Sequence, residues 1–256
     1  MNNQFSLEGK VAIVTGAGAG LGAVFSRALA EAGASVLCTD INEDHAIRTA
    51  TTLVKSGHDA IPLKVDVTSE TESIAMVDEA VDRLGGVNIM VANAGIATVG
   101  SAQDTSLEDW QRVLDVNLTG VFLSAKVAAA RMIEHGTGGS IITIASILGH
   151  GASYPVGAAS YAATKGAVVN LTRDLAVQWA PHNIRVNAIG PAYFPSDMTS
   201  GLLEDRELKA KIESRTPMGR LGRQEELMGP VVFLASEASS YITGHTLYVD
   251  GGWTAW

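Results

Sequence analysis

The sequence is poor in residues that form covalent or metal cross-links. It has one cysteine, Cys38, so no disulfide can form within the chain. None of its six histidines has a partner at a zinc-binding spacing such as H-E-x-x-H. We therefore expect neither a disulfide framework nor a metal site.

Basic charge and long apolar runs are also scarce. The 18 Lys and Arg side chains are outnumbered by 27 Asp and Glu, which gives a net charge of −9 with no run of like charges. This charge balance excludes the basic surface that nucleic-acid binding requires. The first residues, MNNQFSLEGK, lack the features of a signal peptide, and no apolar stretch of about 18 residues is apparent. We expect a cytoplasmic protein with no membrane contact.

Aromatic residues make up only 5% of the chain, whereas glycine reaches 27 residues, which suits helices packed closely on a sheet. β-Branched or apolar runs alternate with segments of helical periodicity, and several runs have no polar face. This order predicts a single α/β domain over 1–256, a doubly wound Rossmann fold with a mostly parallel seven-stranded sheet covered by helices on both faces. Strands are expected at 10–15, 35–39, 60–65, 88–92, 140–146, 184–189 and 246–249, and helices at 21–32, 43–55, 69–84, 107–134 and 161–179.

An irregular stretch follows the sixth expected strand, at 190–222. It contains a polar segment, 204–211, in which Asp205/Lys209 and Glu207/Lys211 have the i,i+4 spacing of helical ion pairs. A solvated surface helix explains these charges. The position of the stretch after a parallel strand also predicts a lid over a ligand site.

A glycine turn, TGAGAGLG, joins the first strand to the first helix and contains Gly16, Gly20, Leu21 and Gly22. Glycine lets the backbone approach a pyrophosphate, and the helix N-terminus supplies unpaired N–H groups. Strand-to-helix turns also need glycine for positive φ values, so the turn alone is a weak signal. Its context favours dinucleotide binding.

Asp40, at the end of the second strand, lies 24 residues after Gly16. At about this distance, an acidic side chain binds the adenosine ribose hydroxyls and repels a 2′-phosphate. No Lys or Arg lies between Gly33 and Asp40. The predicted cofactor is NAD(H), preferred over NADP(H), although Asp40 could instead cap the following helix.

Further motifs follow the glycine turn in a fixed order. With these motifs the chain resembles the short-chain dehydrogenase/reductase family over essentially its whole length. They are Asp66-Val67, Ala92-Asn93-Ala94-Gly95, Asn117, Ser146 and the Tyr161–Lys165 pair.

The resemblance implies a catalytic set of four residues. Tyr161 is the expected proton donor and acceptor, and Lys165, one helical turn away, favours its phenolate and holds the nicotinamide ribose. Ser146 polarises the substrate oxygen. Asn117 positions a water that relays protons to the lysine. Taken singly, a Tyr/Lys pair arises by chance on many helices, and a serine that ends a strand commonly caps a turn.

The resemblance also supplies other cofactor contacts, although Asp and Asn are common turn residues in any case. Ala192 stands where the family has glycine, which puts the local backbone conformation in doubt, and Ser196 stands where it has threonine. The expected contacts are Asp66, Val67, Asn93 and Gly95 on the adenosine side and Pro191 and Ser196 near the nicotinamide.

The substrate site is expected around the loop after Ser146 and the stretch after Pro191. Tyr161 follows Ser146 by 15 residues, slightly more than is usual in the family, so the loop between them contains an insertion. No arginine pair marks a carboxylate substrate. The expected substrate-binding residues are Ser146, Leu148, His150, Tyr154, Tyr161, Tyr193 and Met198.

The two ends of the chain look most like a bacterial branch with gluconate 5-dehydrogenases, 2-deoxygluconate dehydrogenases and oxoacyl-carrier-protein reductases. We expect interconversion of a secondary alcohol and a ketone in a sugar acid, polyol or other small carbonyl compound. A 3-oxoacyl-thioester reductase and a non-catalytic NAD sensor are the alternatives. A hydrolase that uses Ser146 is disfavoured because no G-x-S-x-G elbow surrounds it.

Small residues are frequent in the helices expected at 107–134 and 161–179. In the family these helices pair across a two-fold axis, and a second axis near the C-terminus completes a homotetramer. The small residues could equally serve packing on the sheet.

Overall fold

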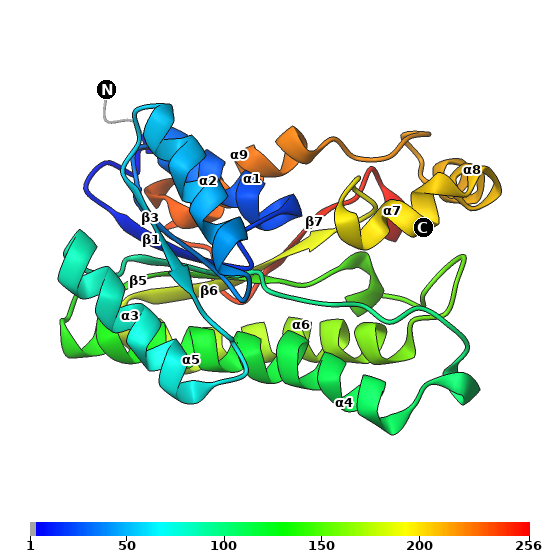
Figure 1. Ribbon diagram of the computed structural model, residues 1–256, viewed down its shortest axis with the longest axis horizontal. Coiled ribbons are helices and arrows are strands. Elements are labelled where there is room, and N and C mark those ends of the chain that lie inside the picture. Colours follow the sequence, from blue (N-terminus) through cyan, green and yellow to red (C-terminus); the bar gives the residue numbers. More distant parts are fainter. Residues whose placement is uncertain (1–3) are drawn as a thin grey trace.

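A seven-stranded parallel sheet runs through the middle of the molecule (Figure 1). The computed structural model describes residues 4–256. The strand order is β3-β2-β1-β4-β5-β6-β7, and every neighbouring pair is parallel. This confirms the predicted doubly wound α/β fold. The strands are β1 (Val11–Thr15), β2 (Ser35–Asp40), β3 (Ala60–Lys64), β4 (Ile89–Ala92), β5 (Gly139–Ile144), β6 (Ile184–Pro191) and β7 (Thr246–Val249).

Helices cover both faces of the sheet, as expected for parallel strands joined by crossovers. In Figure 1, α1, α2 and α9 lie on one face, and α3, α5 and α6 lie on the other. The helices are α1 (Gly20–Glu31), α2 (Glu43–Lys55), α3 (Glu70–Leu84), α4 (Leu107–Leu114), α5 (Gly120–Glu134), α6 (Ala159–Trp179), α7 (Asp197–Glu204), α8 (Arg206–Arg215) and α9 (Met228–Ala235).

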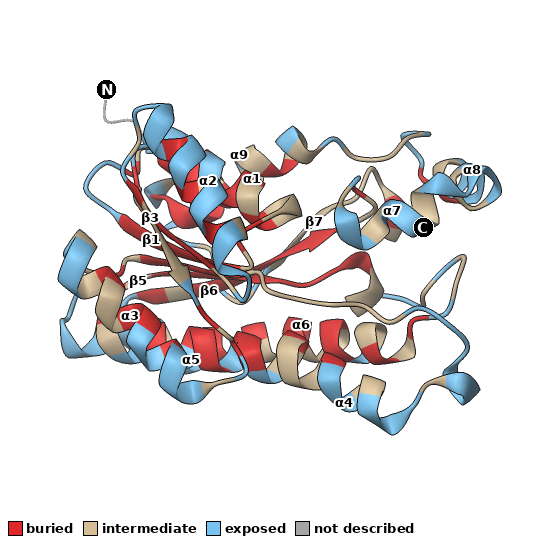
Figure 2. Cartoon of the chain, in the orientation of Figure 1, coloured by how far each residue is buried: buried red, intermediate tan, exposed pale blue. Residues whose placement is uncertain are grey.

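Two apolar cores lie on the two faces of the sheet. Along β1, Ala12 and Val14 point into the core beneath α1, whereas Val11 and Ile13 point into the core beneath α3 and α5. The sheet is therefore buried on both sides (Figure 2). β1 pairs with both β2 and β4. Chain connections leave in opposite directions there, so a crevice opens at the carboxyl ends of β1 and β4, where α/β sheets bind ligands.

The single long helix expected at 107–134 is divided. A π-helical turn, Asp115–Thr119, joins α4 to α5 and contains Asn117. Such turns are uncommon and often occur at functional sites. By length and composition, Leu107–Glu134 is also the one helix of the described chain apolar enough to cross a membrane. The expectation that no such stretch exists is therefore wrong; α5 instead packs against α3, β4 and β5.

The stretch after β6 forms two helices where one was expected. Asp205 lies outside both helices and caps α8, because its carboxylate accepts hydrogen bonds from Glu207 N and Leu208 N. Within residues 4–256, the expected Asp205/Lys209 ion pair does not form, and Lys209 instead faces Glu213 at 3.9 Å. The Glu207/Lys211 pair is present at 2.7 Å.

Candidate active site

The glycine turn leaves the N-terminus of α1 open. Gly16 and Gly20 have φ values of +62° and +52°, which favour glycine. A Cβ on Gly22 would lie 2.0 Å from the Gly16 carbonyl oxygen, so turn and helix pack too closely for any side chain there. Within residues 4–256 no side chain caps α1, and the first turn of α1 has no acidic residue. Its free N–H groups therefore form a ready anion site.

The next three helices, unlike α1, have capped N-termini. Asn42, Ser69 and Ser106 cap α2, α3 and α4 with their side chains. The Asp40 carboxylate accepts from Gly18 N at 3.0 Å and from Asn42 N at 2.9 Å. Because Asn42 is the cap of α2, Asp40 is not needed for capping. Its carboxylate lies beside the glycine turn.

Asn93 links the chain after β4 to the end of β1, at the crevice between these strands. Its side-chain amide donates to the carbonyls of Thr15 at 2.8 Å and Gly16 at 3.1 Å. The Thr15 hydroxyl accepts from the backbone N–H groups of Asn93 and Ala94. Asp66 is likewise engaged locally, accepting from the backbone and hydroxyl of Thr68. Asn93 and Asp66 thus stabilise turns, as the sequence analysis allowed for Asp and Asn residues. Both also line the cavity described below.

Ser146, Tyr161 and Lys165 converge on one end of this crevice. Ser146 follows β5, and its hydroxyl accepts from Leu148 N at 3.1 Å. Tyr161 and Lys165 occupy successive turns at the start of α6. The Lys165 ammonium donates to the Ile144 carbonyl at 2.6 Å and lies 5.4 Å from the centre of the Tyr161 ring.

Burial dominates the protonation of these groups. Desolvation raises the pKa of Tyr161 above its usual value, and a hydrogen bond with Ser146 opposes this rise. Desolvation also lowers the pKa of Lys165 to about 8. Both shifts favour the uncharged form, so the protein alone does not give Tyr161 the lowered pKa that the sequence led us to expect from Lys165.

Asn117 is fully buried in the π-helical turn and positions the loop that follows β4. Its side chain accepts from Ile96 N and donates to Ile96 O, both at 2.8 Å. Its amide also lies 3.4 Å from the Thr164 hydroxyl on α6. Asn117 thus joins the chain after β4 to the helix of Tyr161 and Lys165. Its predicted role in holding a water stays a prediction.

A cavity of about 380 Å³ connects the glycine turn to Ser146 and Tyr161. The residues predicted to bind the cofactor all line it, together with Ser146 and Met198. Open N–H groups, a carboxylate at the Asp40 end and hydroxyl and ammonium groups at the other end fit an extended dinucleotide. Ala19 and Ala94 also line the cavity and belong to the quoted motifs, although neither was named as a contact. Sequence reasoning missed other lining residues, which belong to no motif: Ile41, Val65, Ile96, Val116, Ile144, Ala145, Asp197 and Thr199.

Four predicted substrate residues lie outside this cavity lining. Leu148 packs in an apolar cluster with Ile147, Ile212 and Trp253. His150 makes an edge contact with Tyr248, with ring centres 5.5 Å apart. The Tyr193 hydroxyl donates to the carbonyl of Tyr154. These residues form an adjoining wall rather than the cavity itself.

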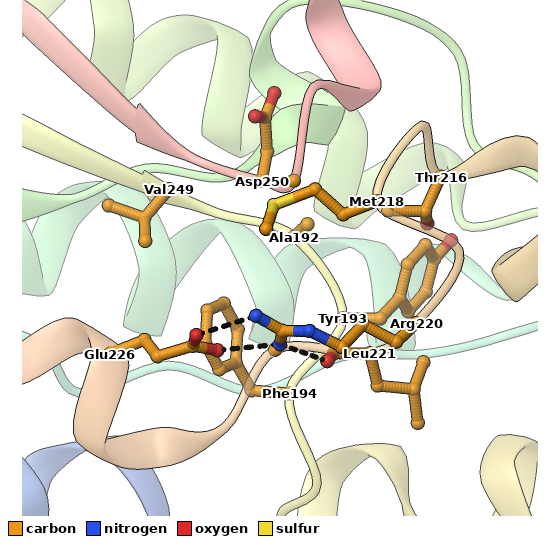
Figure 3. A pocket seen from close by; sticks show the side chains of 12 residues that line it. Ala192, Tyr193, Phe194, Thr216, Met218, Arg220, Leu221, Glu226, Val249 and Asp250 are labelled. Carbon is orange, nitrogen blue, oxygen red and sulfur yellow. Dashed lines mark hydrogen bonds and ion pairs between the residues drawn. The ribbon is translucent and has the colours of Figure 1, made fainter.

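Tyr193 lines a second cavity, of about 130 Å³ (Figure 3). The Arg220 guanidinium makes two hydrogen bonds to the Glu226 carboxylate there, at 2.8 and 2.7 Å. Ala192 and Phe194 line both cavities and therefore separate them. Among the described non-glycine residues, only Asn183 has positive φ, so alanine at position 192 introduces no backbone strain.

Comparisons with known proteins agree with this geometry. A family model described as enoyl-(acyl carrier protein) reductase matches residues 16–254. The chain is 42% identical over 252 residues to 2-dehydro-3-deoxy-D-gluconate 5-dehydrogenase of Escherichia coli (strain K12), covering 98% of each chain.

Two solved structures have nearly the same fold. One is a short-chain type dehydrogenase/reductase from Mycobacterium marinum, with a TM-score of 0.96 and 42% identity over 99% of both chains. The other is a gluconate 5-dehydrogenase from Burkholderia cenocepacia J2315 in complex with NADP and tartrate, with a TM-score of 0.95 and 38% identity over 99% of this chain and 98% of that chain. The chain belongs to the short-chain dehydrogenase/reductase family.

Proposed function

We propose that the protein is an NAD(H)-dependent oxidoreductase that interconverts a secondary alcohol and a ketone in a sugar acid or a related small polyol. One observation carries this proposal: Ser146, Tyr161 and Lys165 meet at one end of a cavity whose other end is a glycine turn. That arrangement supports the proposal, because a dinucleotide bound along the cavity would bring its nicotinamide end next to these acid/base groups.

The reaction needs a proton transfer and a polarised oxygen from the protein, and the nicotinamide supplies or accepts the hydride. In reduction, the Tyr161 hydroxyl donates a proton to the ketone oxygen, and its raised pKa keeps that proton available at neutral pH. Ser146 donates a hydrogen bond to the same oxygen. Lys165, protonated at neutral pH, places a positive charge beside the tyrosine as the phenolate forms.

The preference for NAD(H) rests on charge. Of the described residues that line the large cavity, only Lys165 is basic, and it lies at the Tyr161 end. Asp40 faces the opposite end, where a 2′-phosphate would meet a carboxylate with no compensating cation. The solved gluconate 5-dehydrogenase contains NADP, so the two cofactors need direct comparison.

The substrate class rests on the relatives, whose names refer to gluconates. The matching family model is described as an enoyl-(acyl carrier protein) reductase, which makes an acyl-carrier-protein thioester the second candidate class. Within that class a 3-oxoacyl thioester has the ketone that alcohol/ketone chemistry requires. Because the stretch 190–222 supplies Met198 and Thr199 to the cavity wall, we assign it as a lid. We further propose that residues 1–256 act as one catalytic domain in the cytoplasm, and that the protein is a homotetramer. Light scattering, which gives the mass of the assembly, tests the tetramer.

The deciding experiment follows NADH absorbance with wild-type protein and Tyr161→Phe. The panel contains sugar acids, polyols, cyclic ketones, diketones and 3-oxoacyl thioesters, each with NAD(H) and with NADP(H). We expect turnover of a sugar acid by wild type and a loss of at least about 100-fold in Tyr161→Phe with NADH binding retained. NADH binding without turnover of any compound would instead favour a sensor, and substantial activity in the variant would refute the role of Tyr161.

A further inference from the structure

Arg215, the last residue of α8, packs over two aromatic rings that also contact each other. Its guanidinium carbon lies 5.0 Å from the ring centre of Tyr154 and 4.7 Å from that of Trp253. These rings come from the loop after Ser146 and from the C-terminal segment. The two ring centres are only 6.4 Å apart, so the guanidinium lies over the pair rather than between them. This cation–π contact uses none of its N–H donors, which remain for other partners.

That edge has no acidic partner within the described chain. Arg215 forms no ion pair in residues 4–256, whereas nearby Arg220 makes a double hydrogen bond to Glu226. A guanidinium fork of this kind matches a carboxylate with two parallel hydrogen bonds. The stack therefore holds a recognition group in place without using its donors.

The Tyr154–Trp253 ring pair also contacts residues close to Ser146 and Tyr161. Tyr193 packs edge-on against Trp253, with ring centres 5.3 Å apart. Burial raises the pKa of the Tyr193 hydroxyl to about 12; Tyr161 adds to this rise and Arg215 opposes it, so both lie near that hydroxyl. Ile147, directly after Ser146, shares an apolar cluster with Trp253 and with Ile212 of α8. Arg215 is exposed and lies outside the lining of the large cavity, against the adjoining wall through Tyr154 and Trp253.

The charge of the cavity makes this position important for an anionic substrate. Asp40, Asp66 and Asp197 line the cavity, and its one described cation, Lys165, is already hydrogen-bonded to the Ile144 carbonyl. A substrate carboxylate therefore needs another cation. Arg215 is a cation with free donors beside the predicted substrate loop.

We propose that Arg215 recognises the carboxylate of the substrate and so determines the preference for sugar acids over uncharged polyols. Tyr154 and Trp253 position its guanidinium for this contact. The inference rests on the proposed sugar-acid activity and identifies the residue that selects the substrate class.

The test compares kcat/KM for D-gluconate and for D-glucitol, which lacks the carboxylate. In Arg215→Gln we expect a roughly 10- to 100-fold loss for gluconate, the size of a lost hydrogen bond to a charged group, with less than about a threefold change for glucitol. Arg215→Lys keeps the charge but not the fork, and its loss should be intermediate. Arg206→Gln makes the same charge change at the exposed start of α8 and should leave both values unchanged.

Equal losses for both substrates would overturn the proposal and assign Arg215 a purely structural role in the lid. No loss for either substrate would overturn it as well. Binding of tartrate and of its uncharged counterpart threitol, measured by tryptophan fluorescence, separates this inference from the proposed activity. If neither sugar compound is oxidised but Arg215→Gln selectively weakens tartrate binding, the activity is wrong and the carboxylate site stands. Tartrate binding that is absent in wild type, or equal in the variant, would reject the site.

Discussion

The Lys165 ammonium lies 5.4 Å from the centre of the Tyr161 ring and donates a hydrogen bond to the Ile144 carbonyl, which ends β5. This hydrogen bond links the first turns of α6 to the carboxyl end of β5, which Ser146 follows. Lys165 is only 3% exposed, so it loses much of its hydration on folding. Folding therefore disfavours the protonated form of Lys165, and this should appear as a pH dependence of stability.

Replacing Lys165 with methionine should change how stability depends on pH. The pKa of Lys165 falls from 10.5 to about 8 on folding, so between these values the unfolded chain holds more protons. The free energy of unfolding of the wild type should then rise by about 2 kcal/mol between pH 7.5 and pH 9.5 from this group. Below pH 10 the unfolded tyrosine is still protonated, so the raised pKa of Tyr161 adds little.

Urea unfolding at several pH values measures this effect. Lys165→Met should lack the rise, whereas Lys10→Met, at an exposed position, should keep it. Parallel pH profiles for wild type and Lys165→Met would contradict a strongly perturbed lysine.

Removing the Ser146 hydroxyl should shift the pH profile of alcohol oxidation. Its hydrogen bond lowers the pKa of Tyr161, so in Ser146→Ala that pKa should rise and the ascending limb of log kcat/KM should move to higher pH. The rate itself should fall by about 100-fold because the substrate oxygen loses a donor. A slower variant with an unmoved ascending limb would separate Ser146 from the titration of Tyr161.

The sequence predicted the sheet well because apolar strands and helical periods repeat locally. It could not predict the π-helical turn at Asn117, because the same residue types also fit a continuous α-helix. It likewise placed Asp205 inside a helix, although its side chain caps that helix from outside. Spacing identifies which residues are close along one element, but it does not show which side chains meet between distant segments.

The candidate site shows the same limit. The glycine turn, Asp40 and the Tyr161–Lys165 pair lie within short motifs, and all of them line the cavity. The stack of Arg215 on Tyr154 and Trp253 joins three segments without a motif, so only their packing reveals it. Contacts between loop residues from distant segments therefore have to be read from the tertiary structure.

Asp40→Asn should relax the choice of cofactor. The substitution keeps one side-chain oxygen, so only one of the hydrogen bonds from Gly18 N and Asn42 N can remain, and it removes the negative charge beside the cavity. The ratio of kcat/KM with NAD to that with NADP should fall by roughly tenfold or more, since repulsion of a 2′-phosphate disappears. Asp44→Asn, an exposed position in the first turn of α2, makes the same charge change and should preserve the ratio. An unchanged ratio in Asp40→Asn would show that another feature selects the cofactor.

Gly22→Ala should damage the nucleotide end of the cavity. The new Cβ would lie 2.0 Å from Gly16 O and 2.6 Å from the side-chain nitrogen of Asn93, so the turn and the Asn93 contacts must shift. We expect a loss of about 1–3 kcal/mol in the free energy of unfolding together with weaker NADH binding, measured by urea titration and fluorescence. Gly86→Ala is the matched control, because its Cβ would meet nothing within 4 Å. If Gly22→Ala bound NADH as tightly as the control, the close packing of turn and helix would not be what shapes the cofactor site.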